Sequence, residues 1–198
     1  MDKEKILIDK KTLKKRIKEL AGEITEDYKG KEPVLICVLK GAVFFFTDLA
    51  RNIDLDCELD FMKAASYEDE ESTGEVDIQI DVTTDIKGRD VIVVEDIIDT
   101  GITMHYMKEY IKENYKPKNL YTCILIKRNN LNLKYDELAD FTGLETDEQR
   151  YIVGFGFDYY GILRNEPYVY VPSMKDIQEL NELLEEDKKL HSDMTKEH

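Results

Sequence analysis

The chain has 198 residues, of which 42% are hydrophobic and 10% aromatic, enough to bury the core of one globular domain. Its 43 acidic residues outnumber 28 basic ones, and the formal charge of −15 excludes nucleic acid and anionic membranes as natural partners. No apolar run approaches the roughly 20 residues that span a bilayer, and no signal peptide is recognisable, so we expect a soluble, cytoplasmic protein.

The cysteines and histidines predict neither a disulfide framework nor a zinc site. Cys37, Cys57 and Cys123 stand apart in the sequence, without a close pair to hold a metal, and we expect them to be buried, reduced thiols. Two of the three histidines, His191 and His198, lie in a polar tail. A Ser-His-Asp site is therefore not expected either.

In chain order, the first predicted elements are a short strand at 6–8 and an amphipathic helix that begins after Asp9 and ends at Gly30. A continuous apolar run at 34–39 predicts a strand buried on both faces of a parallel sheet. The dipeptide Lys40-Gly41 then turns the chain into a second helix over 42–51.

Two half-buried strands are predicted next, separated by a charged loop. In the first strand the apolar face consists of Leu55, Cys57, Leu59 and Phe61; the second covers 76–80. Residues 66–74 between them are too charged to bury. A loop of this length in a compact domain is either a lid over a site or a solvated hairpin tip.

The second half of the chain continues the alternation of helices and apolar strands. Strands are predicted at 91–94, 120–126, 152–153 and 168–171, and a helix after Thr103. This order predicts an α/β fold with an open sheet. An apolar stripe then marks an amphipathic helix within 174–198, which we separate from the main domain, 1–173, and expect to dock on this domain or on a neighbouring subunit.

The stretch most informative about chemistry is 91–103, a buried strand that ends in Glu95 and Asp96 and is followed by Asp99 and a Thr-Gly-x-Thr turn. Ligands of open α/β sheets bind at the carboxyl ends of strands. Backbone amides at the start of the following helix favour a phosphate group, whereas the carboxylates suit ribose hydroxyls and magnesium. A sugar phosphate fits both halves of this pattern.

Residues 91–103, with Glu-Asp-Ile-Ile-Asp-Thr-Gly at 95–101, resemble the phosphoribosyl pyrophosphate motif of the type I phosphoribosyltransferases, and specifically their hypoxanthine-guanine branch. The resemblance extends to about Pro172. It implies a mainly parallel open sheet flanked by helices, a small hood, a Mg²⁺ cofactor and a homodimer or homotetramer. It also implies phosphoribosyl binding by Glu95, Asp96, Asp99, Thr100, Gly101, Ile102 and Thr103, with Glu95 and Asp96 near the metal.

Three further motifs carry the same resemblance. Lys40-Gly41 resembles the family's pyrophosphate loop, in which a non-proline cis peptide precedes the lysine; by itself, this dipeptide predicts only an ordinary turn. Ser66 and Tyr67 resemble the start of the lid over the pyrophosphate. The stretch 153–159 resembles a further family motif, and the resemblance implies that Asp158 holds a magnesium ion at the pyrophosphate and that Arg164 beyond it contacts the leaving group.

The base pocket matches the family with one departure. Tyr151 matches the aromatic residue that stacks on the purine and Ile152 the backbone that reads its edge, although an aromatic beside a strand is more often part of a core. The stretch Asp-Phe-Thr-Gly at 140–143 also matches, but Leu138 stands where the family has a lysine that donates to the purine 6-oxo group. Lys134 from a shifted loop, or backbone and water, would replace this lysine.

The resemblance implies purine salvage, in which phosphoribosyl pyrophosphate and hypoxanthine or guanine give IMP or GMP and pyrophosphate. Asp99 would be the catalytic residue, accepting the proton lost from N7. Three alternatives remain open: a sister enzyme that prefers xanthine or another base, a non-catalytic regulator on the same fold, and an interaction module that uses the acidic surface.

Overall fold

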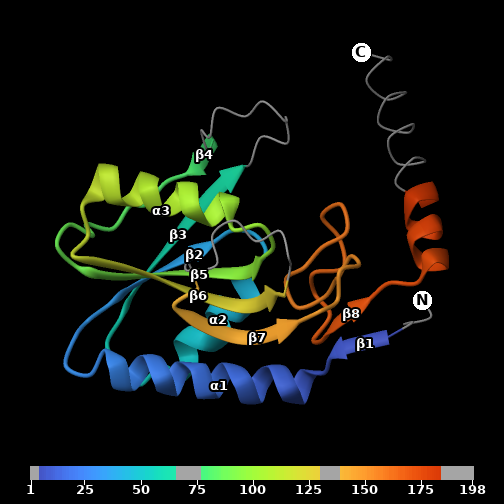
Figure 1. Ribbon diagram of the computed structural model, residues 1–198, viewed down its shortest axis with the longest axis horizontal. Coiled ribbons are helices and arrows are strands. Elements are labelled where there is room, and N and C mark those ends of the chain that lie inside the picture. The colour runs from blue at the N-terminus through green and yellow to red at the C-terminus, as the bar shows by residue number, and fades with distance from the viewer. Residues whose placement is uncertain (1–4, 66–76, 130–138, 184–198) are drawn as a thin grey trace, which may run out of the picture.

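The computed structural model describes residues 5–65, 77–129 and 139–183 (Figure 1). Its centre is a six-stranded sheet with the strand order β4-β3-β2-β5-β6-β7. All neighbours are parallel except β3 and β4, which run antiparallel. The strands are β2 (Val34–Val38), β3 (Glu58–Ala65), β4 (Asp77–Ile80), β5 (Asp90–Ile98), β6 (Asn119–Arg128) and β7 (Phe141–Thr146). The predicted mainly parallel α/β sheet is confirmed.

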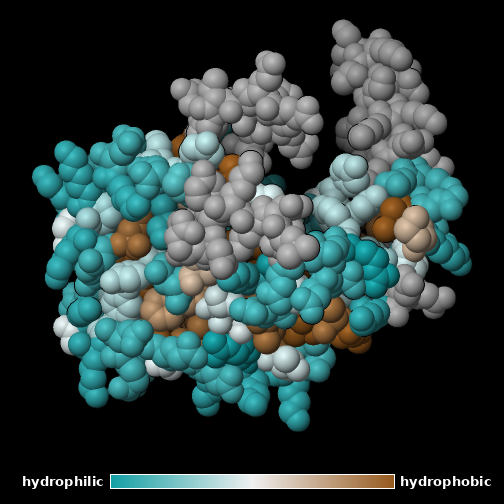
Figure 2. Space-filling view, in the orientation of Figure 1, coloured by the Kyte–Doolittle hydropathy of each residue, from teal (hydrophilic) through white to brown (hydrophobic). Residues whose placement is uncertain are grey.

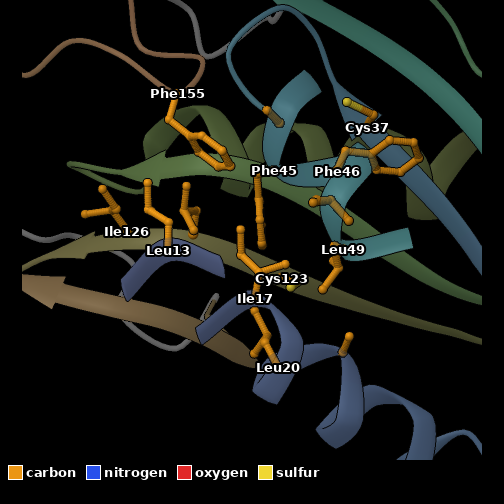
Figure 3. Packing of buried hydrophobic residues seen from close by; sticks show 14 of the residues in the cluster. Leu13, Ile17, Leu20, Cys37, Phe45, Phe46, Leu49, Cys123, Ile126 and Phe155 are labelled. Carbon is orange, nitrogen blue, oxygen red and sulfur yellow. The ribbon is translucent and has the colours of Figure 1, made fainter. Parts of the chain in front are cut away.

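One face of this sheet is covered by α1 (Lys10–Asp27) and α2 (Val43–Asn52). The predicted N-cap is present, since Asp9 Oδ1 accepts a hydrogen bond from the backbone N–H of Thr12 at 2.8 Å. Figure 3 shows Leu13 and Ile17 of α1 packing beside Phe45 of α2. Cys37 and Cys123 are buried free thiols, as predicted, and Cys57 is half-buried.

The opposite face of the sheet is covered by α3 (Ile102–Tyr115). Its buried residues, Met104, Met107 and Ile111, pack in one cluster with the β-branched residues of β5. Because both faces are covered, the middle strands are apolar throughout: β2 is buried at every position. The predicted helix after Thr103 is confirmed, and it begins two residues earlier, at Ile102.

The prediction for β3 was wrong about which side chains face inward. Asp60 and Met62 are buried, whereas Leu59 and Phe61 remain 46% and 41% exposed. Asp60 turns inward because its carboxylate accepts the backbone N–H groups of Thr83 and Thr84, at 2.8 and 2.7 Å. Further backbone and hydroxyl donors satisfy this buried charge, so it replaces an apolar contact without an unpaired group.

A second, two-stranded antiparallel sheet pairs β1 (Lys5–Ile8) with β8 (Val169–Val171), far apart in sequence. We call this sheet and the loops at 147–168 the hood. The predicted strand at 152–153 is reduced to a single bridge between Val153 and Tyr170. In contrast, β7 was not predicted as a strand, because its sequence alternates little and contains Gly143.

Beyond β8, residues 174–183 form the predicted C-terminal helix, seen in orange-red in Figure 1. Ser173 and Asp176 cap its start: the N–H of Asp176 donates to Ser173 Oγ at 3.0 Å and the N–H of Ser173 donates to Asp176 Oδ2 at 3.2 Å. None of the helices in the described ranges is long and apolar enough to cross a bilayer. The face shown in Figure 2 is largely hydrophilic over the described residues.

Candidate active site

The site lies where the strand order reverses, between β2 and β5. After β2 the chain continues to β3 on one side, whereas β5, β6 and β7 follow on the other side. The parallel register pairs Cys37 with Val94, so the loops that leave the two strands begin at the same edge of the sheet. Such a reversal opens a crevice at the carboxyl ends of the strands, where ligands bind.

Three backbone segments meet in this crevice around Gly41. The peptide bond between Leu39 and Lys40 is cis, as predicted. A Cβ on Gly41 would lie 1.9 Å from Asp96 Oδ2, and a Cβ on Gly156 would lie 2.0 Å from the carbonyl oxygen of Gly41. Neither glycine position accepts a side chain without displacing its neighbours. The loop after β2, the end of β5 and the hood are thus in direct contact.

A first pocket of about 260 Å³ lies between the end of β5 and the start of α3. Gly101 is buried and has a φ of +76°, a left-handed conformation that glycine adopts without cost and that lets α3 begin at Ile102. The Thr100 hydroxyl oxygen accepts a hydrogen bond from the backbone N–H of Ile102 at 3.4 Å. Polar groups and the start of α3 make this pocket suitable for an anion. It is lined by residues 95–101, Thr103 and Met104.

A second pocket of about 230 Å³ lies beside the first, between the sheet and the hood. It brings together Asp99, Tyr151, Ile152 and Asp158, four residues singled out from sequence and distributed over 60 positions of the chain. Tyr151 stands at its rim with 54% of its surface exposed, whereas Ile152 is buried. A flat ligand would therefore find a solvent-accessible aromatic ring at the entrance.

Asp158 and Arg164 are joined to each other and to the hood backbone. The distance between Arg164 Nη2 and Asp158 Oδ1 is 2.8 Å, and Asp158 Oδ2 accepts the N–H of Gly161 at 2.6 Å. Arg164 also donates from Nη1 to the carbonyl oxygen of Gly156 at 2.5 Å. This pairing holds a carboxylate and a guanidinium at the entrance to the crevice, in fixed relative positions.

Glu95 and Asp96 form a carboxylate pair at the end of β5. Burial raises the pKa of Glu95 well above its ordinary value, and the adjacent charge of Asp96 adds to the effect. Burial also raises the pKa of Asp96, although the hydrogen bond from Glu95 and the charge of Arg164 oppose the rise. The pair therefore holds a proton more strongly than isolated carboxylates do, and a cation or a hydroxyl donor would stabilise its ionised form.

The chain matches the family model of the phosphoribosyl transferase domain over residues 5–160. It is 44% identical over 168 residues to the hypoxanthine-guanine-xanthine phosphoribosyltransferase of Tritrichomonas foetus, a match that covers 85% of this chain and 91% of that protein. Identity to the hypoxanthine-guanine phosphoribosyltransferase of Bacillus subtilis is 40%, covering 86% and 93% of the two chains. This chain belongs to the hypoxanthine-guanine phosphoribosyltransferase family.

Solved structures agree with this membership of the phosphoribosyltransferase family. The hypoxanthine phosphoribosyltransferase of Staphylococcus aureus superposes with a TM-score of 0.82 at 34% identity, covering 88% of this chain and 94% of the other. The predicted family and fold class are therefore confirmed. The central sheet and its crevice correspond to a fold shared with these enzymes.

Some of the residues that the phosphoribosyltransferase resemblance singled out lie outside the described ranges. These are Ser66 and Tyr67, expected in a lid, and Lys134 and Leu138, expected to bear on recognition of the base. Lys40 is described and exposed, next to Gly41. Across residues 5–65, 77–129 and 139–183, no group of three His, Cys, Asp or Glu side chains forms a metal site by itself.

Sequence reasoning missed Arg128, which lines the second pocket from the end of β6. Its guanidinium donates to the carbonyl oxygens of Gln149 and Arg150, at 2.9 and 3.0 Å, directly before Tyr151. Nε of Arg128 is buried and makes no hydrogen bond within the described part of the chain. The sequence signal that could have identified Arg128 is its position as a cationic residue at the end of the apolar strand β6.

Proposed function

We propose that this protein is a purine salvage enzyme that transfers the 5-phosphoribosyl group of phosphoribosyl pyrophosphate to hypoxanthine or guanine, giving IMP or GMP and pyrophosphate. The observation that carries the proposal is the pairing of an anion pocket at the start of α3 with a second pocket rimmed by Tyr151, with Asp96 and Asp99 lining both. A phosphoribosyl group in the first pocket would present its anomeric carbon toward a base in the second.

Each predicted residue has a role in this proposal. Glu95 and Asp96 bind the ribose hydroxyls, and the segment from Thr100 to Thr103 binds the 5-phosphate through backbone amides and hydroxyls. Pyrophosphate is bound by Lys40, the amide of Gly41 and Arg164, with the expected lid residues Ser66 and Tyr67 closing over it. Tyr151 stacks on the purine and the backbone of Ile152 reads its edge.

In the proposed reaction, N9 of the purine forms a bond to the anomeric carbon while the bond from this carbon to pyrophosphate breaks. Asp99 accepts the proton lost from N7 and stabilises the positive charge that develops on the base. Its position supports this role, because Asp99 lines both the anion pocket and the base pocket. Proton transfer by a positioned carboxylate of this kind contributes about 10²- to 10⁴-fold to the rate.

The carboxylates of the site fit a magnesium ion. Magnesium prefers oxygen ligands and is typically bound through one or two carboxylates together with substrate phosphates. Asp158 on the hood side, and Glu95 and Asp96 on the sheet side, offer such oxygens around the crevice. When bound, the ion would neutralise the charge of the leaving pyrophosphate.

We also propose a cytoplasmic homodimer or homotetramer, as the family resemblance implies. The base preference is the part of the proposal that depends on the departure at Leu138. The T. foetus relative is named for xanthine as well as hypoxanthine and guanine, so xanthine is the natural competing base. A pocket with a leucine at this position loses one donor to the 6-oxo group, a group that all three bases share.

The test is pyrophosphate release from phosphoribosyl pyrophosphate and Mg²⁺ with hypoxanthine, guanine, xanthine and adenine offered separately. We expect turnover with hypoxanthine or guanine and none with adenine, which lacks the 6-oxo group. Turnover with xanthine alone would identify a sister enzyme. No turnover with any base, combined with Mg²⁺-dependent binding of phosphoribosyl pyrophosphate, would identify a non-catalytic regulator.

A further inference from the structure

The C-terminal helix, 174–183, packs directly on the part of the hood that borders the base pocket. Leu180 is only 3% exposed and belongs to one buried cluster with Val153, Tyr159 and Tyr170. Ile177 packs against the same cluster. The family model ends at residue 160, before this helix begins. Its contact with the hood nevertheless reaches residues adjacent to Asp158.

A hydrogen bond lies on the polar side of this contact. The hydroxyl of Tyr159 donates to Asn181 Oδ1 at 2.8 Å, across 22 positions of the sequence. Tyr159 is 8% exposed, so this hydroxyl would otherwise lose a hydrogen bond to water without replacement. Asn181 thereby fixes the position of the Tyr159 side chain from outside the hood.

Tyr159 in turn contacts Tyr151, the residue at the rim of the base pocket. Their rings are perpendicular, with centroids 5.6 Å apart and an interplanar angle of 85°, a favourable edge-to-face arrangement. Tyr160 packs on Tyr159 in the same way, with ring centroids 4.9 Å apart. Because Tyr151 is more than half exposed, its ring has few other contacts to restrict its rotation.

We propose that Asn181 is a positioning residue of the base site: through the Tyr159 hydroxyl, the C-terminal helix holds the Tyr151 ring in the orientation that stacks on the purine. The inference rests on the proposed function, since it assigns Tyr151 to the base. It predicts a larger effect on the purine than on phosphoribosyl pyrophosphate, because the proposed 5-phosphate pocket between β5 and α3 is lined by residues of these two elements and the turn between them.

The experiment uses the full chain and three variants. Asn181→Leu keeps the side-chain size and removes the hydrogen bond; Tyr159→Phe removes the same bond from the other partner; the third variant combines both changes. Gln178→Leu is the matched control, since this exposed amide on the same helix bonds only to Glu182 in the described structure, at 3.3 Å. KM for hypoxanthine and for phosphoribosyl pyrophosphate is measured for each variant.

We expect each single variant to raise the KM for hypoxanthine by about three- to tenfold, the range that one hydrogen bond supports. The KM for phosphoribosyl pyrophosphate stays within about twofold, and the double variant adds nothing further, because both changes remove the same interaction. A hypoxanthine KM unchanged in Asn181→Leu, equal changes in both KM values, or multiplicative effects in the double variant would overturn the inference.

Amide hydrogen exchange provides a measurement that does not depend on catalysis. Peptides covering 149–162 should exchange faster in Asn181→Leu and Tyr159→Phe than in the wild type or Gln178→Leu, because the hood loses its hydrogen bond to the helix. Unchanged exchange would refute the positioning role even in an inactive protein. A wild type that turns over no base would instead refute the proposed function, leaving the exchange result to decide the inference.

Discussion

Replacing Gly156 with alanine tests whether the contact between the hood and the loop after β2 positions the site. The new Cβ would lie 2.0 Å from the carbonyl oxygen of Gly41, so the two segments must separate by about 1.5 Å to reach ordinary van der Waals distance. Gly156 also has a φ of +106°, and a left-handed conformation costs an alanine about 1–2 kcal/mol. The carbonyl oxygen of Gly156 also accepts a hydrogen bond from Arg164. A displacement of Gly156 would therefore move the Arg164 side chain as well.

A displacement of about 1 Å at a catalytic geometry reduces the rate by roughly 100-fold, and we expect kcat/KM for phosphoribosyl pyrophosphate to fall by this factor in Gly156→Ala. The matched control is Gly30→Ala, because Gly30 has a φ of +76° and open space where the new methyl group would lie. This control should lose about 1–2 kcal/mol of stability at unchanged kcat/KM. Thermal unfolding and pyrophosphate release measure the two effects. Wild-type kcat/KM in Gly156→Ala would refute the argument.

Three further predictions concern single side chains of the site. Asp99→Asn should lower kcat by about 100-fold or more, while the Kd for phosphoribosyl pyrophosphate, measured by calorimetry, changes much less; an unchanged kcat would remove Asp99 from proton transfer. The raised pKa of Glu95 means that the folded state holds a proton which the unfolded chain releases, so wild-type stability should fall as the pH rises above the ordinary value of 4.5 toward the raised pKa. Glu95→Gln should flatten this dependence in thermal melts between about pH 4 and pH 8, and an equal slope in both proteins would contradict the assignment. Arg128→Gln removes two charged hydrogen bonds to the backbone before Tyr151, so the KM for the base should rise about tenfold while that for phosphoribosyl pyrophosphate stays constant; equal effects on both would contradict a local role.

Local sequence patterns predicted some residues of the site but not others. Residues 95–103 are contiguous, so their order along the chain already places carboxylates, threonines and a glycine at one strand end. The Leu39–Lys40 cis peptide was expected from a motif of a few residues. By contrast, Arg128 donates hydrogen bonds to Gln149 and Arg150, which lie 21 and 22 positions further along the chain. No local sequence pattern predicts these hydrogen bonds.

The wrong prediction for β3 has a similar cause. Alternation of Leu59 and Phe61 with acidic residues is a valid signal for a half-buried strand, but it assumes that the charged face meets water. Asp60 meets the N–H groups of Thr83 and Thr84 instead, more than 20 residues later in the chain. Hydrogen bonds between distant segments thus reversed the assignment of faces that local periodicity suggested.

The sequence alone determined the fold class, the family and the chemical character of the strand-end motif, because buried strands, helix periodicity and short ligand-binding stretches depend on neighbours in the chain. Only the tertiary structure decided what surrounds the two pockets. It placed Gly156 against Gly41, Arg128 behind Tyr151, and Asn181 on Tyr159. Each of these contacts joins segments that are brought together by sheet order and hood packing, and the free energy that stabilises them comes from burial shared across the whole domain.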